Sequence, residues 1–503
     1  MPKKATGWDN IPPKLMKIAA KELSQPISSM INKSIRCSVF PADLKKAEVS
    51  PIYKAKDNLF KGNYRPISIL PCISKVYERV MYDQLYQFVH EVLSPLLSAF
   101  RKHYGCNHVV TLLLENCKRA LERGEHTGVI LMDLSKAFDC LPHDLLLHKL
   151  KCYGLSEAAC TFINSYLSSR FQRVKIGSTK SEWSRLTMGV PQGSVMGPLL
   201  FNIFINYLLY KIGNECFIYN YADDNTLSYS NVDIELVKEH LEYCTSLAPD
   251  WCKNNGMRAN ADKFQAFVIS PRLKKCDVEF LVNGIPIQCK SPVKLLGVKL
   301  DDNLTFEHHI KHMCHRASRQ INALSRISKY IDVDVRMSLY RAFIESNFQY
   351  CNTVWHFCSK ASLFKLEKLN KRALRVVLND HISCYSDLLS NSKCTSLYLS
   401  RIKTIAIETF KCINGINPEY LSIFDKVEHK YESRRGTMLR LPKVVNEMSG
   451  KHSFGYQGAK IWNELPIYLK HPMSLQDFKN NISAWEGPDC LCGSCILCQI
   501  KQF

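Results

Sequence analysis

Two adjacent aspartates place the strongest constraint on how this chain can fold. Asp223 and Asp224 belong to the sequence "YADD", which follows the apolar stretch "CFIYN". Carboxylates beside so hydrophobic a run are costly to bury unless something binds them. The longer segment, "CFIYNYADDNTLSYS", predicts a β-hairpin in which two apolar arms surround the acidic turn. A cation at this turn would remove the cost.

A third carboxylate ends a predicted buried strand. The segment "TGVILMD" is rich in β-branched and large apolar residues and ends in Asp133. If the hairpin packs beside this strand, the three carboxylates converge at one sheet edge, where like charges cannot all stay ionised without a cation. Carboxylate oxygens suit hard divalent ions, Mg²⁺ above all. Two such ions, about 3.5–4 Å apart, would hold a triphosphate and activate a primer 3′-hydroxyl.

The rest of the chain predicts an α+β protein of several parts. Its 503 residues exceed what one compact core normally holds. The segments "AEVSPIY" and "YRPISIL" predict a β-hairpin whose link, "KAKDNLFKGN", is basic and rich in turn residues. Further strands are predicted in "ADKFQAFVIS" and "VKLLGVKL". The pattern also predicts helices over residues 14–25, 75–93, 142–154 and 231–257, and in the apolar segment after "GVPQGS".

From about residue 305 the chain changes character. The segment "HIKHMCHRASRQINAL" predicts a helix with one apolar face and one cationic face. The apolar face consists of Ile310, Met313, Ala317, Ile321 and Leu324. The opposite face carries Lys311, His312, His315, Arg316 and Arg319. Further helices are expected to about residue 415, whereas residues 430–486 are predicted to be irregular and basic.

The balance of charge points to a polyanionic partner. Lys and Arg total 67 against 46 Asp and Glu, which gives a net charge of +21. A membrane surface is the rival interpretation, but the sequence has no basic amphipathic anchor or lipidation signal, so we favour nucleic acid. The N-terminus has no signal-peptide core, and the longest apolar window is interrupted by Gly197, Pro198 and two asparagines. We therefore expect an intracellular protein, in the nucleus or cytoplasm, with free thiols.

Four cysteines gather in the C-terminal segment "CLCGSCILC". They are Cys490, Cys492, Cys495 and Cys498, and their spacing contains two Cys-x-x-Cys steps, which suits zinc. One continuous nine-residue segment is short for a closed tetrahedral site, and it lacks histidine. Zn²⁺ ligands, redox-active thiols and idle thiols all remain open interpretations.

Several motifs together resemble a known family. In order along the chain they are "NYRPISIL", "LMDLSKAFDCLPH", "GVPQGSVMGPLLF", "YADD" and "VKLLGVKLDDNLTF", followed by "KLEKLNKRALRVV", "FKCINGINPEYL" and "AKIWNELP". This set resembles the reverse transcriptases of non-LTR retrotransposons, close to the jockey-like group. The resemblance implies a right-hand polymerase with fingers, palm and thumb, followed by a mostly α-helical C-terminal region.

The resemblance also implies roles for individual residues in the palm. Asp133, Asp223 and Asp224 match the aspartates that bind two Mg²⁺ ions, for which Mn²⁺ can substitute. Phe138 matches the residue beneath the nucleotide sugar. An aromatic ring there leaves no room for the 2′-hydroxyl that distinguishes RNA precursors from DNA precursors. Lys263 matches a lysine proposed to protonate the departing pyrophosphate.

Other matched positions concern the nucleotide, the template and the primer. Arg65, with Lys54 or Lys56 across the fingers hairpin, resembles the clamp on the triphosphate, because arginine suits a bidentate phosphate contact. Gln192 and Gly193 resemble a template contact, where glycine lets the backbone approach closely. Tyr221 is expected near the primer end. The helix that carries Arg316 and Arg319 resembles the thumb, which would grip the duplex backbone.

These expectations combine into one prediction for the whole chain. It is an RNA-directed DNA polymerase that uses an RNA template, a DNA primer and dNTPs, with no membrane partner. An inactive nucleic-acid-binding remnant and an RNA-templated RNA polymerase are the alternatives, and Phe138 speaks against the second. The chain begins near the family's stretch at "KKATGWDNIP", so we expect it to lack the upstream endonuclease. The expected parts are a helical extension of the fingers (1–34), a reverse transcriptase domain (35–300), a thumb with following helices (301–415), a basic C-terminal region (416–486) and a Cys-rich tail (487–503).

Overall fold

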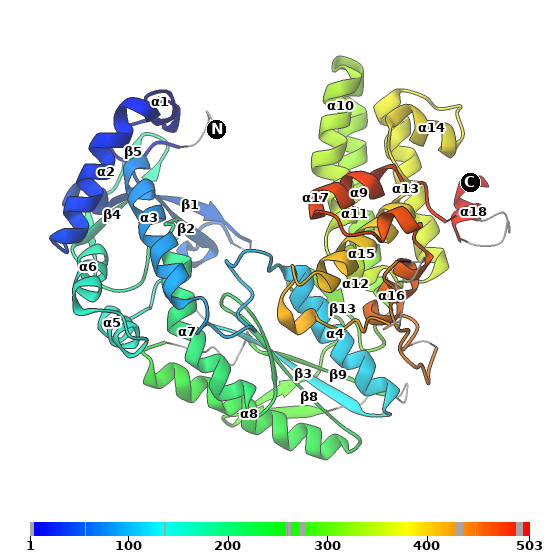
Figure 1. Cartoon of the computed structure of the whole chain (residues 1–503), viewed down its shortest axis with the longest axis horizontal. Coiled ribbons are helices and arrows are strands. Elements are labelled where there is room, and N and C mark those ends of the chain that lie inside the picture. The colour runs from blue at the N-terminus through cyan, green and yellow to red at the C-terminus, as the bar shows by residue number, and fades with distance from the viewer. Residues whose placement is uncertain are drawn as a thin grey trace. The chain divides into compact units, whose positions relative to one another are not determined.

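The computed structural model divides into two compact units. It describes residues 5–55, 57–134, 137–257, 259, 263–271, 278–427, 436–447, 449–488 and 496–502. Unit 1 consists of Met1–Phe100, Met132–Asn225 and Tyr243–Lys263, and unit 2 consists of Arg101–Leu131, Thr226–Glu242 and Phe264–Phe503. Three of the points of division fall inside β3 (His126–Asp133), β8 (Asp224–Asn231) and α8 (Ile234–Asn254), which are labelled in Figure 1.

The predicted hairpin of the fingers is confirmed in unit 1. Strand β1 (Lys46–Tyr53) pairs antiparallel with β2 (Tyr64–Ile69) and parallel with β4 (Arg170–Ile176). The short strands β5 (Thr179–Lys180) and β6 (Ser184–Leu186) also pair with β4. The sheet thus joins two segments that are far apart in the sequence.

A buried carboxylate holds this sheet together. Glu48 of β1 forms ion pairs with Arg173, Lys175 and Lys180, which lie on β4 and β5. Burial by itself raises the pKa of Glu48, but the hydrogen bonds from the three cations outweigh that effect and hold the pKa at about 2. Glu48 therefore remains ionised and fully paired inside the sheet.

In the described part of unit 1, six α-helices lie wholly within the unit. They are α1 (Pro13–Ile18), α2 (Ala20–Arg36), α3 (Cys72–Val89), α5 (His143–Cys152), α6 (Glu157–Leu167) and α7 (Gly197–Gly213). The apolar helix α7 is buried on most sides, as its sequence predicted. Its two asparagines satisfy backbone groups: Asn202 donates to the carbonyl of Ala99, and Asn206 donates to that of Val92. Within the described ranges, no helix is long and apolar enough to cross a membrane.

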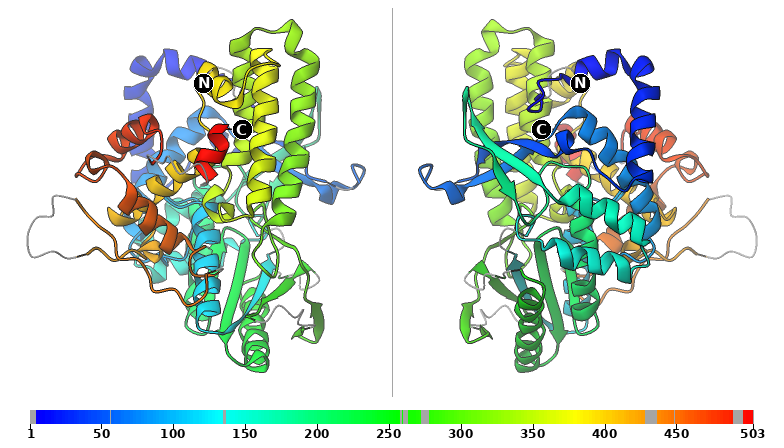
Figure 2. Two further views of the ribbon diagram at one scale, coloured as in Figure 1. Left: turned by 90° about the vertical axis from the view of Figure 1, so that its right-hand side faces the viewer. Right: turned by 90° about the vertical axis from the view of Figure 1, so that its left-hand side faces the viewer.

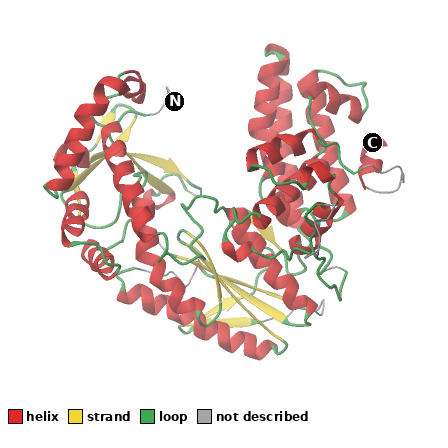
Figure 3. Ribbon diagram, in the orientation of Figure 1, coloured by secondary structure: helices red, strands yellow, loops and turns green. Residues whose placement is uncertain are grey.

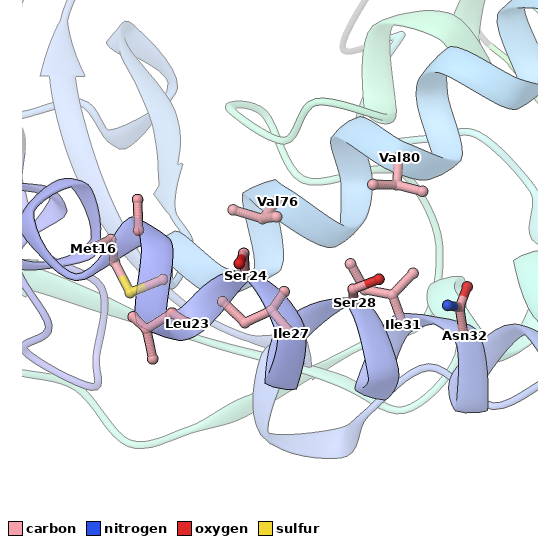
Figure 4. A pocket seen from close by; sticks show the side chains of 10 residues that line it. Met16, Leu23, Ser24, Ile27, Ser28, Ile31, Asn32, Val76 and Val80 are labelled. Atoms are coloured by element: carbon pink, nitrogen blue, oxygen red, sulfur yellow. The ribbon is translucent and has the colours of Figure 1, made fainter.

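The N-terminal helical segment extends further than its apolar pattern predicted. The expected helix ended at residue 25, whereas α2 continues to Arg36 through an internal proline, Pro26. Between α2 and α3 lies an apolar groove of about 400 Å³, to which Ile27 and Val76 contribute (Figure 4). Leu15 and Ile18 of the predicted apolar face are exposed.

A four-stranded sheet carries the acidic motifs. Its strand order is β7-β8-β3-β9, where β7 is Phe217–Tyr221 and β9 is Gln265–Ile269. Strands are yellow in Figure 3. Strand β3 is central and almost wholly buried, which explains its continuous run of apolar residues. At Gly128, α8 packs so closely on β3 that a Cβ would come within 2.8 Å of side chains of Val237 and Leu241.

One predicted strand was wrong. The segment "VKLLGVKL" forms two strands, β12 (Val293–Leu295) and β13 (Val298–Leu300), which pair antiparallel. Leu296 and Gly297 turn the chain between them with φ values of 44° and 87°. Glycine adopts such a conformation without steric cost, so the central "LG" is a turn signal within an apolar run. A second hairpin, β10 (Glu279–Val282) with β11 (Ile285–Gln288), precedes it.

The cationic helix is confirmed in unit 2. Helix α9 (Glu307–Ile327) buries all five residues of its predicted apolar face. Lys311, His312, His315, Arg316 and Arg319 are all exposed on the other side. Helix α9 packs beside α13 (Lys360–Leu378), and the two run next to each other in Figure 2. Between α9 and α13 in the sequence lie the helices α10 (Val333–Leu339), α11 (Ser346–Gln349) and α12 (Asn352–Trp355). After α13 come α14 (Tyr385–Ser392) and α15 (Leu397–Ile413).

Residues 430–486 are more regular than predicted. They contain α16 (Phe454–Glu464) and α17 (Leu475–Ala484), whose apolar faces form a core with α15. The ring of Phe478 stacks on that of Phe410 with centroids 4.3 Å apart and lies 6.0 Å from the ring of Trp462. Each helix is three turns long or less, so its periodicity is easily hidden by the surrounding basic and turn residues.

Helix α4 (Cys106–Glu122), which was not predicted, anchors this C-terminal region. The Glu115 carboxylate accepts hydrogen bonds from the backbone N–H groups of Phe454 and Gly455, at the start of α16. Glu122 accepts from the N–H groups of Val445 and Asn446. Glu115 thereby satisfies donors that the start of α16 leaves unpaired, whereas Glu122 binds the backbone of the loop before it. The C-terminal region is thus part of the core of unit 2.

Candidate active site

The acidic turn is held by buried amides. Ala222 takes up the left-handed conformation, with φ of 57°, between β7 and β8. The side-chain N–H₂ group of Asn220 donates to the carbonyl of Ala222 and to Oδ1 of Asn225, both at 2.9 Å. Both asparagines are fully buried. The turn that presents Asp223 and Asp224 is therefore fixed by the residues on either side of it.

The turn meets the end of β3, as the sequence predicted. The backbone N–H of Leu134 donates to the carbonyl of Asp223 at 3.4 Å. This bond places Asp133, the last residue of β3, beside the acidic pair, and all three carboxylates belong to unit 1. The structure thus brings together three residues, of which Asp133 and Asp224 lie 91 positions apart in the sequence.

The electrostatics of the three carboxylates are unfavourable. Burial raises the pKa of Asp223, and the charge of Asp133 raises it further. Asp224 is exposed, yet the surrounding protein displaces enough water to raise its pKa, and the charges of Asp223 and Asp133 contribute to a value of about 6. Such mutual repulsion is what a bound cation would relieve.

Three cationic side chains act on this cluster. The Lys263 ammonium lies 3.1 Å from Oδ2 of Asp133 and is itself exposed. The positive charges of Arg65 and then Lys54 lower the pKa of Asp223, against the larger effects that raise it. The predicted fingers pair therefore faces the aspartates. Lys56, the alternative to Lys54, lies outside the described residues.

The three carboxylates fit a divalent cation by their chemistry. They supply hard oxygen donors and repel one another, which are the properties of a site for Mg²⁺ or Mn²⁺. In the part of the chain that the structure describes, no three His, Cys, Asp or Glu side chains are gathered closely enough to hold a metal ion as they stand. Asp133 is instead paired with Lys263. Cation binding would thus require these side chains to rearrange.

Phe138 lies between two other aromatic rings. Its ring stacks on that of Phe201, with centroids 4.5 Å apart and an interplanar angle of 26°. The ring of Phe100 lies 6.0 Å away and nearly perpendicular, at 89°. Phe138 is only half-buried, so one part of its ring remains accessible.

The predicted template loop is tied to both neighbouring elements. The Gln192 side chain donates to Oδ1 of Asp139 at 2.8 Å, and its carbonyl accepts from the N–H of Ser68 in β2 at 2.7 Å. Gly193 has φ of 118°, and a Cβ there would lie 2.6 Å from the Ser68 carbonyl. Glycine is required at this position because the loop backbone packs directly on β2.

A buried carboxylate, that of Glu78, binds the backbone directly after this loop. Glu78 of α3 accepts hydrogen bonds from the backbone N–H groups of Val195 and Met196, which follow the loop. Burial raises the pKa of Glu78. Neither Glu78 nor Asp139 was assigned a role from the sequence. Asp139 is the second acid of "DLSKAFD", so a signal was present, whereas nothing local indicates this role of Glu78, because Val195 and Met196 lie more than 100 residues away.

The predicted primer and duplex residues lie on separate elements. Tyr221 ends β7 and is half-buried next to the acidic turn. Arg316 and Arg319 lie on the exposed face of α9 in unit 2.

The cysteine tail lies largely outside the described residues. Cys490, Cys492 and Cys495 are among those not described, and only Cys498 is placed, where it is buried in α18 (Ile496–Gln502). The cysteines that are described are free thiols. The zinc interpretation has no support from the structure.

Comparison with known proteins agrees with this site. Residues 52–300 match the family "Reverse transcriptase (RNA-dependent DNA polymerase)". The probable RNA-directed DNA polymerase from transposon BS of Drosophila melanogaster is 28% identical over 399 residues, covering 75% of this chain and 43% of that protein. The RNA-directed DNA polymerase from mobile element jockey of Drosophila funebris is 27% identical over 389 residues, covering 75% of this chain and 42% of that protein. The chain therefore spans less than half the length of these curated relatives.

Solved structures give a weaker likeness. The apo telomerase from Candida tropicalis aligns with a TM-score of 0.39 and 11% sequence identity, over 80% of this chain and 74% of that chain. Because the score is low, the fold assignment rests on the family match and the strand order. The fold is α+β, of the right-hand polymerase class, and residues 52–300 match the reverse transcriptase family. The curated relatives are named as RNA-directed DNA polymerases of a transposon and of a mobile element.

Proposed function

We propose that this chain is an RNA-directed DNA polymerase of a non-LTR retrotransposon, which extends a DNA primer on an RNA template. The observation that carries the proposal is the meeting of β3 with the acidic turn. It gathers Asp133, Asp223 and Asp224 in a partly buried, mutually repelling cluster. A polymerase that transfers nucleotides needs such a cluster for its divalent metal ions, which reverse transcriptases use as a family.

The three aspartates would hold two Mg²⁺ ions. Once bound, these ions would activate the primer 3′-hydroxyl and neutralise the charge of the transferring phosphoryl group. Asp133 and Asp223 are assigned as direct ligands, and Asp224 as the less tightly coupled third. The family match supports divalent metal in general, and the assignment to these residues is ours.

Residues around the aspartates would position the nucleotide. Arg65 and Lys54 would bind the triphosphate, and their positive charges near Asp223 support this role. Phe138 would exclude the 2′-hydroxyl of a ribonucleotide. Gln192 and Gly193 would contact the template and the nascent base pair from a loop that β2 and Asp139 hold in place.

Lys263 is assigned as the acid that protonates the departing pyrophosphate. Its ammonium reaches the aspartate cluster, as the 3.1 Å contact with Asp133 demonstrates, and it is exposed enough to exchange protons with water. An amine held near several phosphate oxygens is a suitable proton donor. Tyr221 would pack near the primer end, and Arg316 and Arg319 would contact the hybrid backbone.

The proposal extends to the organisation of the chain. We assign residues 1–34 to an extension of the fingers, 35–300 to fingers and palm, 301–415 to the thumb and its following helices, 416–486 to a basic C-terminal region and 487–503 to the Cys-rich tail. RNA, DNA and dNTPs are the proposed partners, in keeping with the net charge of +21.

A primer-extension assay with purified protein tests the function. The substrate is poly(rA) with an oligo(dT) primer, supplied with Mg²⁺ and either dTTP or UTP. We expect extension with dTTP, little with UTP, and none with Asp223→Asn. Extension with UTP but not with dTTP would indicate an RNA polymerase. If the folded protein extends primers on none of several templates, the chain is an inactive remnant. Either result would overturn the proposal.

A further inference from the structure

The environment of Phe138 suggests that its ring does not act alone. Its backbone is fixed, because the carbonyl of Phe138 accepts a hydrogen bond from the N–H of Val190 at 2.9 Å. Gly189 packs against the same carbonyl so closely that a Cβ would lie 2.7 Å from it. The backbone thus cannot shift, and the remaining freedom of Phe138 is rotation of its side chain.

Two neighbouring rings limit that rotation from different directions. Phe201 is fully buried and stacks under the face of Phe138. Phe100 meets the ring edge-on at 89°, a favoured aromatic geometry. The stacked contact holds the plane of the Phe138 ring, whereas the edge contact blocks its movement sideways.

The position of Phe100 is imposed by the fold. Phe100 has φ of 60°, which is unfavourable for a residue with a large side chain, and it is 47% exposed. The preceding carbonyl, of Ala99, accepts a 2.9 Å hydrogen bond from the side chain of Asn202. Asn202 directly follows Phe201 on α7, so one helix supports both rings. A strained, exposed aromatic residue held in this way points to a role other than core packing.

We propose that Phe100 is a positioning residue for sugar selection, which keeps the Phe138 ring in the path of a 2′-hydroxyl. The inference rests on the proposed function, and it adds a residue that does not itself meet the substrate. Without the edge contact, Phe138 can turn aside and admit a ribonucleotide. The reaction with a deoxynucleotide is not affected, because that sugar does not press on the ring.

Single-nucleotide incorporation tests the inference. The primer–template is a DNA primer on RNA with guanine as the next template base, and kcat/KM is measured for dCTP and for CTP. We expect Phe100→Ala to lower the preference for dCTP by about 3- to 10-fold, the range that loss of one aromatic pair gives. The change should come from faster use of CTP, with kcat/KM for dCTP nearly unchanged. Phe100→Tyr keeps the ring and should show the same preference for dCTP as the wild type.

Phe88 supplies a matched control. It is also a phenylalanine of unit 1, it is 48% exposed, and it lies on α3. Phe88→Ala should leave the preference unchanged, which separates the edge contact from the loss of an exposed ring in general. Phe100→Leu keeps apolar bulk without a flat ring edge, and should also lower the preference.

Three results would overturn the inference. In the first, Phe100→Ala uses dCTP normally and keeps the wild-type preference, which leaves the proposed function intact. In the second, Phe100→Ala and Phe100→Leu lose dCTP and CTP incorporation equally, so that Phe100 is purely structural. In the third, wild-type protein incorporates neither nucleotide, and the proposed function fails together with the inference.

Discussion

The aspartates of unit 1 and the buried Glu367 of unit 2 are all carboxylates with reduced access to water, but they differ in what surrounds their oxygens. Glu367 is fully buried and accepts hydrogen bonds from the Tyr385 hydroxyl at 2.6 Å and from the backbone N–H groups of Leu397 and Tyr398. Burial raises its pKa, but these donors satisfy its oxygens. Burial also raises the pKa of Asp223, but here the charge of the neighbouring Asp133 carboxylate raises it further. A buried carboxylate whose oxygens are bound by donors of the protein has a structural role. A desolvated carboxylate that lacks such donors indicates a place for a ligand.

The largest expected effect is on catalysis. Asp223→Asn removes one of the carboxylates of the proposed metal site, so primer extension should fall on the order of a thousandfold or more. Asp133→Asn should have the same effect. The melting temperature should stay equal or rise slightly, because one of several repelling charges is gone. Extension assays and thermal denaturation of the same preparations measure both quantities.

Asp83 provides the control for that prediction. It lies in unit 1 on α3, it is exposed, and its only ion pair in the described structure is with Arg79. Asp83→Asn should retain wild-type extension. If a folded Asp223→Asn or Asp133→Asn protein keeps more than about a tenth of wild-type activity, the carboxylate cluster is not the catalytic centre.

The converse result is expected for Glu367. Glu367→Ala leaves the Tyr385 hydroxyl and two backbone N–H groups without an acceptor, and should lower the free energy of unfolding by about 2–4 kcal/mol. Glu367→Gln keeps an acceptor oxygen and should cost less. Urea denaturation followed by circular dichroism measures the change. A melting curve like that of the wild type for Glu367→Ala would show that the comparison of the two kinds of carboxylate is wrong.

Phe138 gives a smaller effect that is confined to substrate choice. Phe138→Val opens space beneath the sugar while the aspartates are untouched, so discrimination against ribonucleotides should fall by roughly 10- to 100-fold. The ratio of kcat/KM values for dCTP and CTP measures it. An unchanged ratio in an active variant would assign Phe138 to the core that it forms with Phe201.

A feature could be predicted from the sequence when the residues that form it lie close together in the chain. The acidic hairpin and the two faces of α9 were predictable, because each is encoded by a local pattern of apolar and polar residues. The support of Phe138 by Phe100 and of the template loop by Glu78 was not, since these contacts join residues far apart in the sequence. Short helices such as α16 and α17 escaped for a different reason, because basic residues around them obscure their periodicity.

The smallest expected effect concerns nucleic-acid affinity and distinguishes α9 from the basic C-terminal region. Arg316 and Arg319 are exposed on α9, opposite its buried face. Each phosphate neutralised by such a residue contributes roughly −0.7 to −0.9 to the slope of log K against log salt. Reversing both charges, with Arg316→Glu and Arg319→Glu, should therefore weaken hybrid binding and flatten the slope by about 1.4–1.8. Fluorescence anisotropy of an RNA–DNA hybrid at several salt concentrations measures this slope.

A second double variant decides where the contact lies. Lys460→Glu and Lys479→Glu make the same change of charge on the exposed sides of α16 and α17. If α9 grips the hybrid backbone, this pair should lower affinity less and leave the slope nearly as in the wild type. If the slope flattens for this pair and not for the α9 pair, residues 430–486 bind the hybrid instead. Because both pairs change the net charge equally, any difference between the slopes reports local phosphate contacts and not the general attraction of a basic protein for nucleic acid.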